Sequence, residues 1–252
     1  MKELLLEGGV AGHLAHLYDN RNLSFNKVAK ILSLASGGEL VGTEKTDGYN
    51  IYLGYKDGKA KSARNKTHMR AGGIDADQLA AREFQGGEDV KRAYTESFDA
   101  FEAAVESLSP EERIRIFGEN GEIFYNAEIM GPGASNVLNY DTNVITIHHG
   151  GHKKYDPASD KVIDADASGN SAALDKVIDR FEQSITGKKF DIQKTAFMEL
   201  NALDNDSHLK ATLERMKSAG FSGAMTIEEY LEQKMSPAVK KRFGYLRNDL
   251  EQ

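Results

Sequence analysis

A lysine beside an Asp-Gly pair is the first feature of this sequence that can carry chemistry. Residues 44–50 have the sequence Glu-Lys-Thr-Asp-Gly-Tyr-Asn, which sets an acid, an amine and an amide within one short segment. One explanation is an ordinary surface turn, because Asp-Gly is a common hairpin turn and a lysine next to it is usually solvated. The alternative is that Lys45 attacks a phosphorus atom, since a lysine amine becomes a nucleophile when burial and neighbouring cations favour loss of its proton.

Two further segments carry residue types that would serve such a lysine. Residues 62–66, Ser-Ala-Arg-Asn-Lys, lie one predicted hairpin beyond Lys45, so Arg64 can return to the neighbourhood of the lysine. Residues 126–133, Asn-Ala-Glu-Ile-Met-Gly-Pro-Gly, put a carboxylate near the end of a predicted strand. The turn that follows lets a ligand or a backbone approach closely. Each segment also has a plain interpretation, with Arg64 as a surface cation and Glu128 as a strand-end carboxylate.

Hydrophobic periodicity predicts the elements that position these residues. Residues 24–37 show helical spacing, with Ser24 as the N-cap and Gly37-Gly38 at the end of the helix. Residues 40–64 alternate instead and contain Asp57-Gly58, which predicts two or three antiparallel strands with a tight turn.

The predicted elements change character along the rest of the chain. Up to about residue 165 the patterns predict a helical stretch at 75–108, a hairpin around Asn120-Gly121 at 113–130 and a strand at 143–148. Beyond about residue 170 they predict helices with charged outer faces, at 171–185, 190–202, 207–219 and 226–250. The sequence therefore predicts an α+β protein, with an antiparallel-sheet domain at residues 1–165 and a mainly helical region at residues 166–252.

Composition excludes several classes of protein. The 252 residues are 40% hydrophobic and 28% charged, and no run of about 18 apolar residues exists, so neither a disordered chain nor a membrane span is expected. The sequence has no cysteine, which excludes disulfides and thiolate metal sites and fits a cytoplasmic protein, and the N-terminal residues lack the features of a signal peptide. Because the net charge is −7, contact with nucleic acid must be transient or rest on local basic patches, with candidates at Lys153-Lys154, Lys188-Lys189 and Lys240-Lys241-Arg242.

Together these segments resemble the covalent nucleotidyltransferase superfamily, which comprises ATP-dependent DNA ligases, RNA ligases and mRNA capping enzymes. Residues 44–50 are similar to motif I, whose lysine becomes covalently attached to the nucleotide. Residues 62–66 are similar to the arginine segment that follows it, and residues 126–133 to motif III. Residues 143–150, Asn-Val-Ile-Thr-Ile-His-His-Gly, stand where motif IIIa does, without its usual aromatic residue. The resemblance covers roughly residues 10–150.

The closest branch by these residues is the RNA ligase 2 type. DNA ligases usually have arginine where this chain has Asn50, and the Glu44-Lys45 pair is also more similar to RNA ligases. The N-terminal sequence His-Leu-Ala-His-Leu-Tyr-Asp-Asn, together with motif I, is similar to ligase-like proteins of tailed phages. The host cytoplasm is then the expected location.

The resemblance implies a ligase-like adenylation domain that uses ATP and Mg²⁺, the metal arriving largely with the ATP phosphates. It implies a lysyl-AMP intermediate at Lys45 and transfer of AMP to a 5′-phosphorylated RNA or DNA end. Nucleotide contacts are expected from Glu44 to the adenine, from Asn50 and Arg64 to ribose or phosphate, and from Glu128 to ribose or a metal-bound water. Asp47, with Gly48 beside it in the expected nucleotide site, would either orient the lysine or make the turn. The implied nucleotide-binding residues are thus Glu44, Asp47, Gly48, Asn50, Arg64 and Glu128, with Glu128 also facing the metal.

Two later motifs of the family have no counterpart in this sequence. Motif IV, an acid and a glycine on a strand, and motif V, a pair of lysines, are both missing, and Lys240-Lys241 lies in a predicted helix. The domain at residues 1–165 is therefore expected to be incomplete, with residues 166–252 as an insertion or appendage. The interpretations left open are a fragment of a longer enzyme, a divergent enzyme that uses other lysines, and a non-catalytic nucleotide-binding or assembly module with a degenerate ligase fold.

Three histidines at residues 148, 149 and 152 allow a further hypothesis, a metal site. Their spacing matches no established metal motif, so a loop cluster near the phosphate pocket or the surface is the main expectation. A phosphotransferase with a glycine-rich phosphate loop is excluded, because the Gly-x-x-x-x-Gly-Lys-Ser/Thr pattern is missing.

Overall fold

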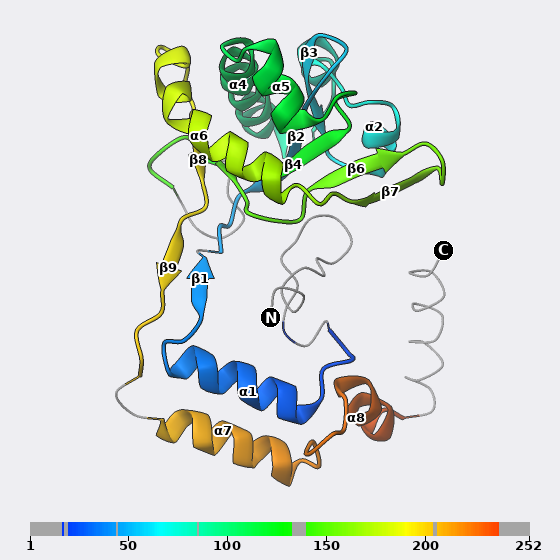
Figure 1. Cartoon of the computed structure of the whole chain (residues 1–252), viewed down its shortest axis with the longest axis vertical. Coiled ribbons are helices and arrows are strands. Elements are labelled where there is room, and N and C mark those ends of the chain that lie inside the picture. The colour runs from blue at the N-terminus through cyan, green and yellow to red at the C-terminus, as the bar shows by residue number, and fades with distance from the viewer. Residues whose placement is uncertain are drawn as a thin grey trace. The chain divides into compact units, whose positions relative to one another are not determined.

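The computed structural model describes residue 17 and residues 20–43, 45–84, 86–132, 140–203 and 206–236. The chain separates into two compact units (Figure 1). Within the described residues, the first unit runs from Lys45 to Ala196. The second unit combines the residues up to Thr43 with those from Phe197 onward. This division differs from the one expected near residue 165, because the next helix and strand along the chain complete the first unit.

The first unit contains a mostly antiparallel open sheet. Its strands follow the order β3-β2-β4-β5-β8, in which only the β5–β8 pair is parallel, and a hairpin of β6 and β7 pairs with the beginning of β4. The strands are β2 (Tyr49–Lys56), β3 (Lys59–Ala63), β4 (Ile123–Met130), β5 (Val144–Ile147), β6 (Lys153–Asp156), β7 (Lys161–Asp164) and β8 (Asp191–Lys194).

The helices of the first unit create its core. They are α2 (Lys66–Arg70), α3 (Ala76–Ala80), α4 (Gly87–Glu106), α5 (Pro110–Phe117) and α6 (Ser168–Ser184). Figure 1 shows α4, α5 and α6 grouped beside the sheet, and apolar residues of these helices join those of the strands in one large core cluster. Tyr94, Phe98 and Phe101 on α4 are buried there, as their helical spacing predicts. Asn50, Glu128, Thr146 and Gln193, described below, project from the opposite face.

Local sequence explains where the elements of this unit begin and end. The β2–β3 hairpin turns at Asp57-Gly58, whose φ angles of 52° and 77° are those of the tight turn predicted from the sequence. The prediction of a hairpin over residues 113–130 is wrong in its first half, because Ser109 and Glu112 form a capping box that starts α5 with Pro110 in its first turn. The second half is confirmed as β4.

The second unit has three helices and a two-stranded ribbon among its described residues. Its elements are α1 (Phe25–Ser36), β1 (Val41–Thr43), β9 (Phe197–Glu199), α7 (Ser207–Ser218) and α8 (Ile227–Lys234). Ser24 accepts from the backbone N–H of Lys27 as the predicted N-cap, and Phe25, Val28 and Phe221 are in the buried cluster. Within the described chain, none of the helices combines the length and the apolar composition needed to cross a membrane.

Predictions for the C-terminal third are confirmed in part. Helices α6 and α7 lie near their expected positions, but the prediction of a helix over residues 190–202 is wrong. Those residues form β8, which pairs with β5, and β9, which pairs with β1 in antiparallel register. Of the helix expected over residues 226–250, α8 covers the beginning, and residues 237–252 lie outside the described residues.

Candidate functional site

The lysine segment is joined to strand β4 by Glu128. The backbone N–H of Gly48 donates to Glu128 Oε2 at 3.0 Å, and Asn50 pairs with Glu128 in the antiparallel register of β2 and β4. Lys45 is exposed and lies just before β2. The structure thus brings together the two segments that contain the expected nucleophile and the expected carboxylate.

Glycine is required at position 48 because of this close approach to β4. A Cβ atom there would lie 2.4 Å from the carbonyl oxygen of Ile129, closer than real Cβ contacts allow. The neighbouring Asp47 N–H donates to the hydroxyl of Tyr140 at 3.0 Å. The backbone that follows Lys45 is therefore held from two directions.

Thr46 supplies an unusual group at the same place. Its residue is only 4% exposed, yet among the described residues its hydroxyl is the one buried side-chain polar atom without a hydrogen-bond partner. The hydroxyl lies close enough to Glu128 to lower the pKa of that carboxyl, but it makes no hydrogen bond of ordinary geometry. A buried hydroxyl without a partner costs about 1 to 3 kcal/mol, so a ligand that accepted from it would recover part of that cost.

A polar row crosses four strands at the level of Glu128. Paired residues on neighbouring strands project from the same face of a sheet, and the register aligns Asn50, Glu128, Thr146 and Gln193. Gln193 Nε2 donates to Thr146 Oγ1 at 3.0 Å. Asn50 Nδ2 donates to Asn126 Oδ1 at 2.6 Å, so the amide donor of Asn50 is used within the sheet.

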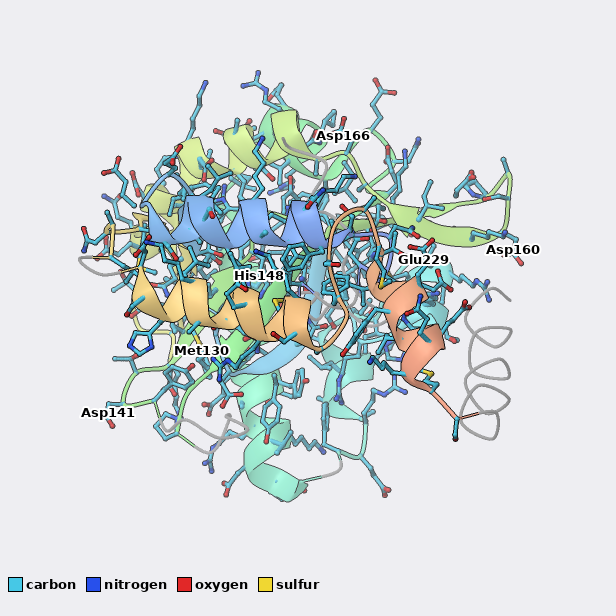
Figure 2. The ribbon with its side chains drawn as sticks, turned by 90° about the horizontal axis from the view of Figure 1, so that it is seen from below. Met130, Asp141, His148, Asp160, Asp166 and Glu229 are labelled. Carbon is cyan, nitrogen blue, oxygen red and sulfur yellow. The ribbon has the colours of Figure 1, made fainter. Side chains whose placement is uncertain are left out.

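His148 stands beside Glu128 on this face. It follows the end of β5 and is labelled in Figure 2. Its Nε2 lies 3.8 Å from Glu128 Oε1, its Nδ1 lies 3.3 Å from Thr195 Oγ1, and all three residues have largely buried side chains. Burial alone would raise the pKa of Glu128, but the nearby His148 and Thr46 side chains and the hydrogen bond from the Gly48 N–H hold it below its ordinary value. This carboxylate is therefore ionised at neutral pH.

His152 has a different role from His148. Strand β4 pairs with β6 at Phe124 and with β5 from Ala127 onward, which leaves the N–H of Asn126 between two partners. His152 Nδ1 accepts from that N–H at 3.2 Å. The histidines expected as a loop cluster are thus buried structural groups at positions 148 and 152. The described residues contain no group of three or more His, Asp or Glu side chains that could hold a metal ion.

Arg64 is linked to the start of β2 by the side chain of Tyr94. The residue follows β3, and its guanidinium lies over the ring of Tyr94 at 4.5 Å and over the ring of Phe84 at 5.2 Å. The Tyr94 hydroxyl donates to the carbonyl oxygen of Asn50 at 3.1 Å, and its ring stacks on that of Tyr49 at 6.0 Å. Burial, foremost, raises the pKa of Tyr94 to about 12, so the hydroxyl keeps its proton. Arg64 and Asn50, both expected in the site, are therefore connected by one buried tyrosine.

Most of the residues predicted from the sequence are thus assembled around the start of β2. Glu44 and the second glycine of the Gly-Pro-Gly turn lie outside the described residues. Sequence reasoning missed Thr46, Tyr94 and the contact of His148 with Glu128. The sequence signals for His148 were its position at the end of a predicted strand and the neighbouring histidines, and neither indicated Glu128 as its partner.

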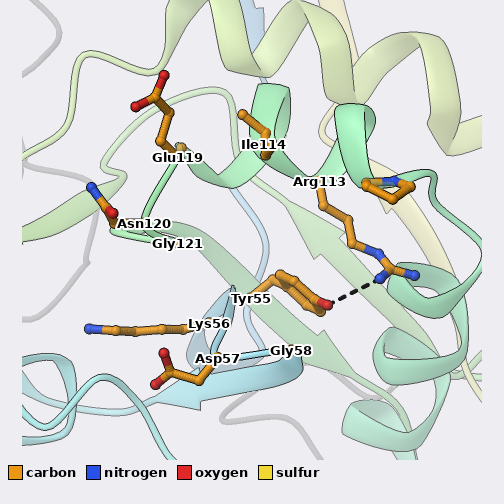
Figure 3. Close-up of a pocket in the computed structure, with 11 residues that line it drawn as sticks. Tyr55, Lys56, Asp57, Gly58, Arg113, Ile114, Glu119, Asn120 and Gly121 are labelled. Atoms are coloured by element: carbon orange, nitrogen blue, oxygen red, sulfur yellow. Dashed lines mark hydrogen bonds between the residues drawn. The ribbon is translucent and has the colours of Figure 1, made fainter.

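A separate pocket lies at the other end of β2 (Figure 3). It has a volume of about 500 Å³ and is bordered by the β2–β3 turn and by the segment after α5. The guanidinium of Arg113 borders this pocket, but it donates to the Tyr55 hydroxyl at 3.1 Å and to the carbonyl oxygens of Val105 and Glu106. Since its charged group is used to join α4, α5 and β2, this pocket is a weaker candidate for chemistry.

Comparison of the chain with protein-family models, with curated proteins and with solved structures gives no match.

Proposed function

We propose that this protein is an ATP-dependent nucleotidyltransferase of the polynucleotide ligase type, which forms a lysyl-AMP intermediate at Lys45. The observation that supports this most is the hydrogen bond from the Gly48 N–H to Glu128. It joins the two segments whose sequences resemble motifs I and III, although 80 residues separate them along the chain.

The proposed first step is attack of the neutral Lys45 amine on the α-phosphorus of ATP. A nitrogen–phosphorus bond forms, the bond from that phosphorus to the bridging oxygen breaks, and pyrophosphate leaves while the amine loses its proton to solvent. The phosphate of a 5′-phosphorylated nucleic-acid end would then attack the same phosphorus and release the lysine. Attack of a neighbouring 3′-hydroxyl on the phosphorus of the 5′-phosphate would seal the ends and release AMP. Mg²⁺ bound to the ATP phosphates would neutralise charge that develops in this transfer.

Arg64 and Thr46 fit a phosphate-containing ligand. Arg64 is exposed, is held on the faces of two aromatic rings and makes no ion pair within the described chain. A guanidinium fixed in this way is suited to phosphate oxygens. The buried hydroxyl of Thr46 adds a donor that lacks a partner.

Glu128 has a positioning role in this proposal. Its carboxylate accepts from Gly48 and faces His148, so it fixes the backbone three residues after the nucleophile. The resemblance implies that Glu128 also contacts ribose or a metal-bound water. That contact would use the carboxylate lone pairs that do not accept from Gly48.

Labelling with α-labelled ATP and Mg²⁺, followed by a denaturing gel, tests the proposal. Label is expected on the parent chain and on Lys66→Arg, an exposed lysine on α2, and none on Lys45→Ala. Label on Lys45→Ala, or on none of the three, contradicts catalysis at Lys45. ATP binding by calorimetry without label would then favour the second candidate, a non-catalytic nucleotide-binding module, which the use of the Asn50 amide donor within the sheet also favours.

A further inference from the structure

A short helix next to Arg64 folds a histidine back onto the chain. Asn65 is the N-cap of α2 and accepts from the backbone N–H of His68 at 2.9 Å. In this arrangement the backbone N–H of Arg64 donates to His68 Nδ1 at 3.2 Å. The imidazole is 8% exposed, so it is fixed within the first unit with one nitrogen already used.

The other nitrogen of His68 also faces a donor. Nε2 contacts Nη1 of Arg82, which comes from the loop after α3. The backbone N–H of Arg64 and the guanidinium of Arg82 can only donate, and a neutral imidazole has one bare nitrogen. His68 can therefore accept from only one of these two groups, and one donor at this point is left without an acceptor.

Positive charge accumulates around this pair without a carboxylate. Among the described residues, neither Arg64 nor Arg82 lies within 4.0 Å of an acidic oxygen, whereas nearby Lys61 pairs with Asp75 at 3.6 Å. Burial first, and then the charges of Arg82 and Arg64, lower the pKa of His68. The ring is therefore neutral at pH 7 and is not a further cation.

We propose that Arg64, His68 and Arg82 form a phosphate-binding subsite. A phosphate group brings several acceptor oxygens and negative charge, and the donors gathered around His68 lack both. The subsite is connected to the lysine segment, because Arg64 lies on Tyr94 and Tyr94 bonds to Asn50. This assignment rests on the proposed function for the source of the phosphate, either the 5′-phosphate of an acceptor end or the phosphates of ATP.

Two substitutions separate the subsite from the structure that supports it. His68→Asn keeps an acceptor for the Arg64 N–H but deletes the ring nitrogen that faces Arg82, and Arg82→Gln removes the charge of the guanidinium. Arg70→Gln is the matched control, since Arg70 is on the same helix and its guanidinium already contacts Asp160. All three are made in the Lys45→Ala chain, so that binding is measured without covalent transfer, and thermal unfolding confirms that each variant is folded.

The experiment compares two pairs of probes by fluorescence anisotropy and calorimetry. The pairs are an oligonucleotide with a 5′-phosphate against the same oligonucleotide with a 5′-hydroxyl, and ATP against adenosine. The parent is expected to prefer the phosphorylated member of at least one pair about tenfold, the amount that one lost charge-assisted hydrogen bond accounts for. His68→Asn and Arg82→Gln should lose that preference, and Arg70→Gln should keep it.

The probe pair for which the two variants lose the preference identifies the source of the phosphate. Loss for the oligonucleotides alone assigns the subsite to the acceptor end, and loss for ATP alone assigns it to the nucleotide. A parent with no preference in either pair, or a preference that survives both substitutions, overturns the subsite. Failure of labelling at Lys45 with the phosphate preference intact would overturn only the proposed function.

Discussion

The two faces of the sheet in the first unit differ in kind although they share the same strands. On β4, Ala127 and Ile129 point into the apolar cluster with α4 and its neighbours. Asn126 and Glu128 alternate with them and belong to the polar side. Between Asn126 and Ile129, alternate residues of β4 therefore contribute to the candidate site and to the hydrophobic core.

The polar face is itself largely buried, which makes it costly to maintain. Asn126 and Thr146 are 2% and 1% exposed, and each makes a side-chain hydrogen bond on that face. Buried polar groups stabilise a fold less than apolar groups of the same size and are costly when their partners are lost. The difference between the faces indicates that stability comes mainly from the helix-covered face.

Removing a large side chain from the helix-covered face should have the greatest effect on stability. Phe98 is 1% exposed, so Phe98→Ala is expected to lower the free energy of unfolding by about 3 to 5 kcal/mol. Ile114→Ala on α5 is the control, because Ile114 is 51% exposed and should cost well under that amount. Equal losses in chemical denaturation would contradict the assignment of the core to this face.

Acid should weaken the point where β4 changes partners. Burial, foremost, and the charge of Lys194 lower the pKa of His152 to about 4, while an unfolded histidine titrates near 6.5. The unfolded chain therefore takes up a proton first as the pH falls, and about 3 kcal/mol of stability should be lost between pH 6.5 and pH 4. His152→Asn retains an acceptor for the Asn126 N–H and should flatten this part of the pH profile.

His208→Asn is the control for that measurement. His208 is exposed on α7 in the second unit, so its substitution should leave the pH dependence of unfolding unchanged. A profile that is equally steep with and without His152 would contradict the buried neutral role.

Substitution on the polar face should have the smallest effect on stability and a larger one on labelling. Glu128→Gln keeps an acceptor for Gly48 but removes the charge, and should lower stability at pH 7 by about 1 kcal/mol. Because the pKa of Glu128 is lowered in the folded protein, the charged form stabilises above the ordinary pKa of about 4.3. This contribution disappears as the pH falls through the folded pKa, so the two stability curves should converge in acid.

Labelling of Glu128→Gln should fall by at least tenfold if the carboxylate positions the lysine segment. Unchanged labelling, or a stability loss as large as that of Phe98→Ala, would contradict the different roles that we assign to the two faces.

Local signals explain most of what the sequence predicted. The Ser24 cap, the Asp57-Gly58 turn and the buried run before His148 all act within a few residues, and the corresponding elements are confirmed. The capping box at Ser109 and Glu112 was an equally local signal, but alternation in the following residues obscured it.

The missed features depend on pairing between distant segments. Strand β8 has four residues, and β5 supplies the partner that makes it a strand. His148 meets Glu128 because of the β4–β5 register, which no local pattern specifies. The motif-like segments suggested candidate residues, whereas the contacts of Thr46 and Tyr94 follow only from the assembled sheet.

The most direct test of the central claim is mass spectrometry of the protein after incubation with ATP and Mg²⁺. Digestion at neutral pH and peptide mapping locate any AMP adduct, and acid lability identifies a phosphoramidate bond. One AMP is expected on the peptide that contains Lys45, and it should be lost on acid treatment. An acid-stable adduct, an adduct on another residue, or unmodified Lys45 at saturating ATP would contradict it.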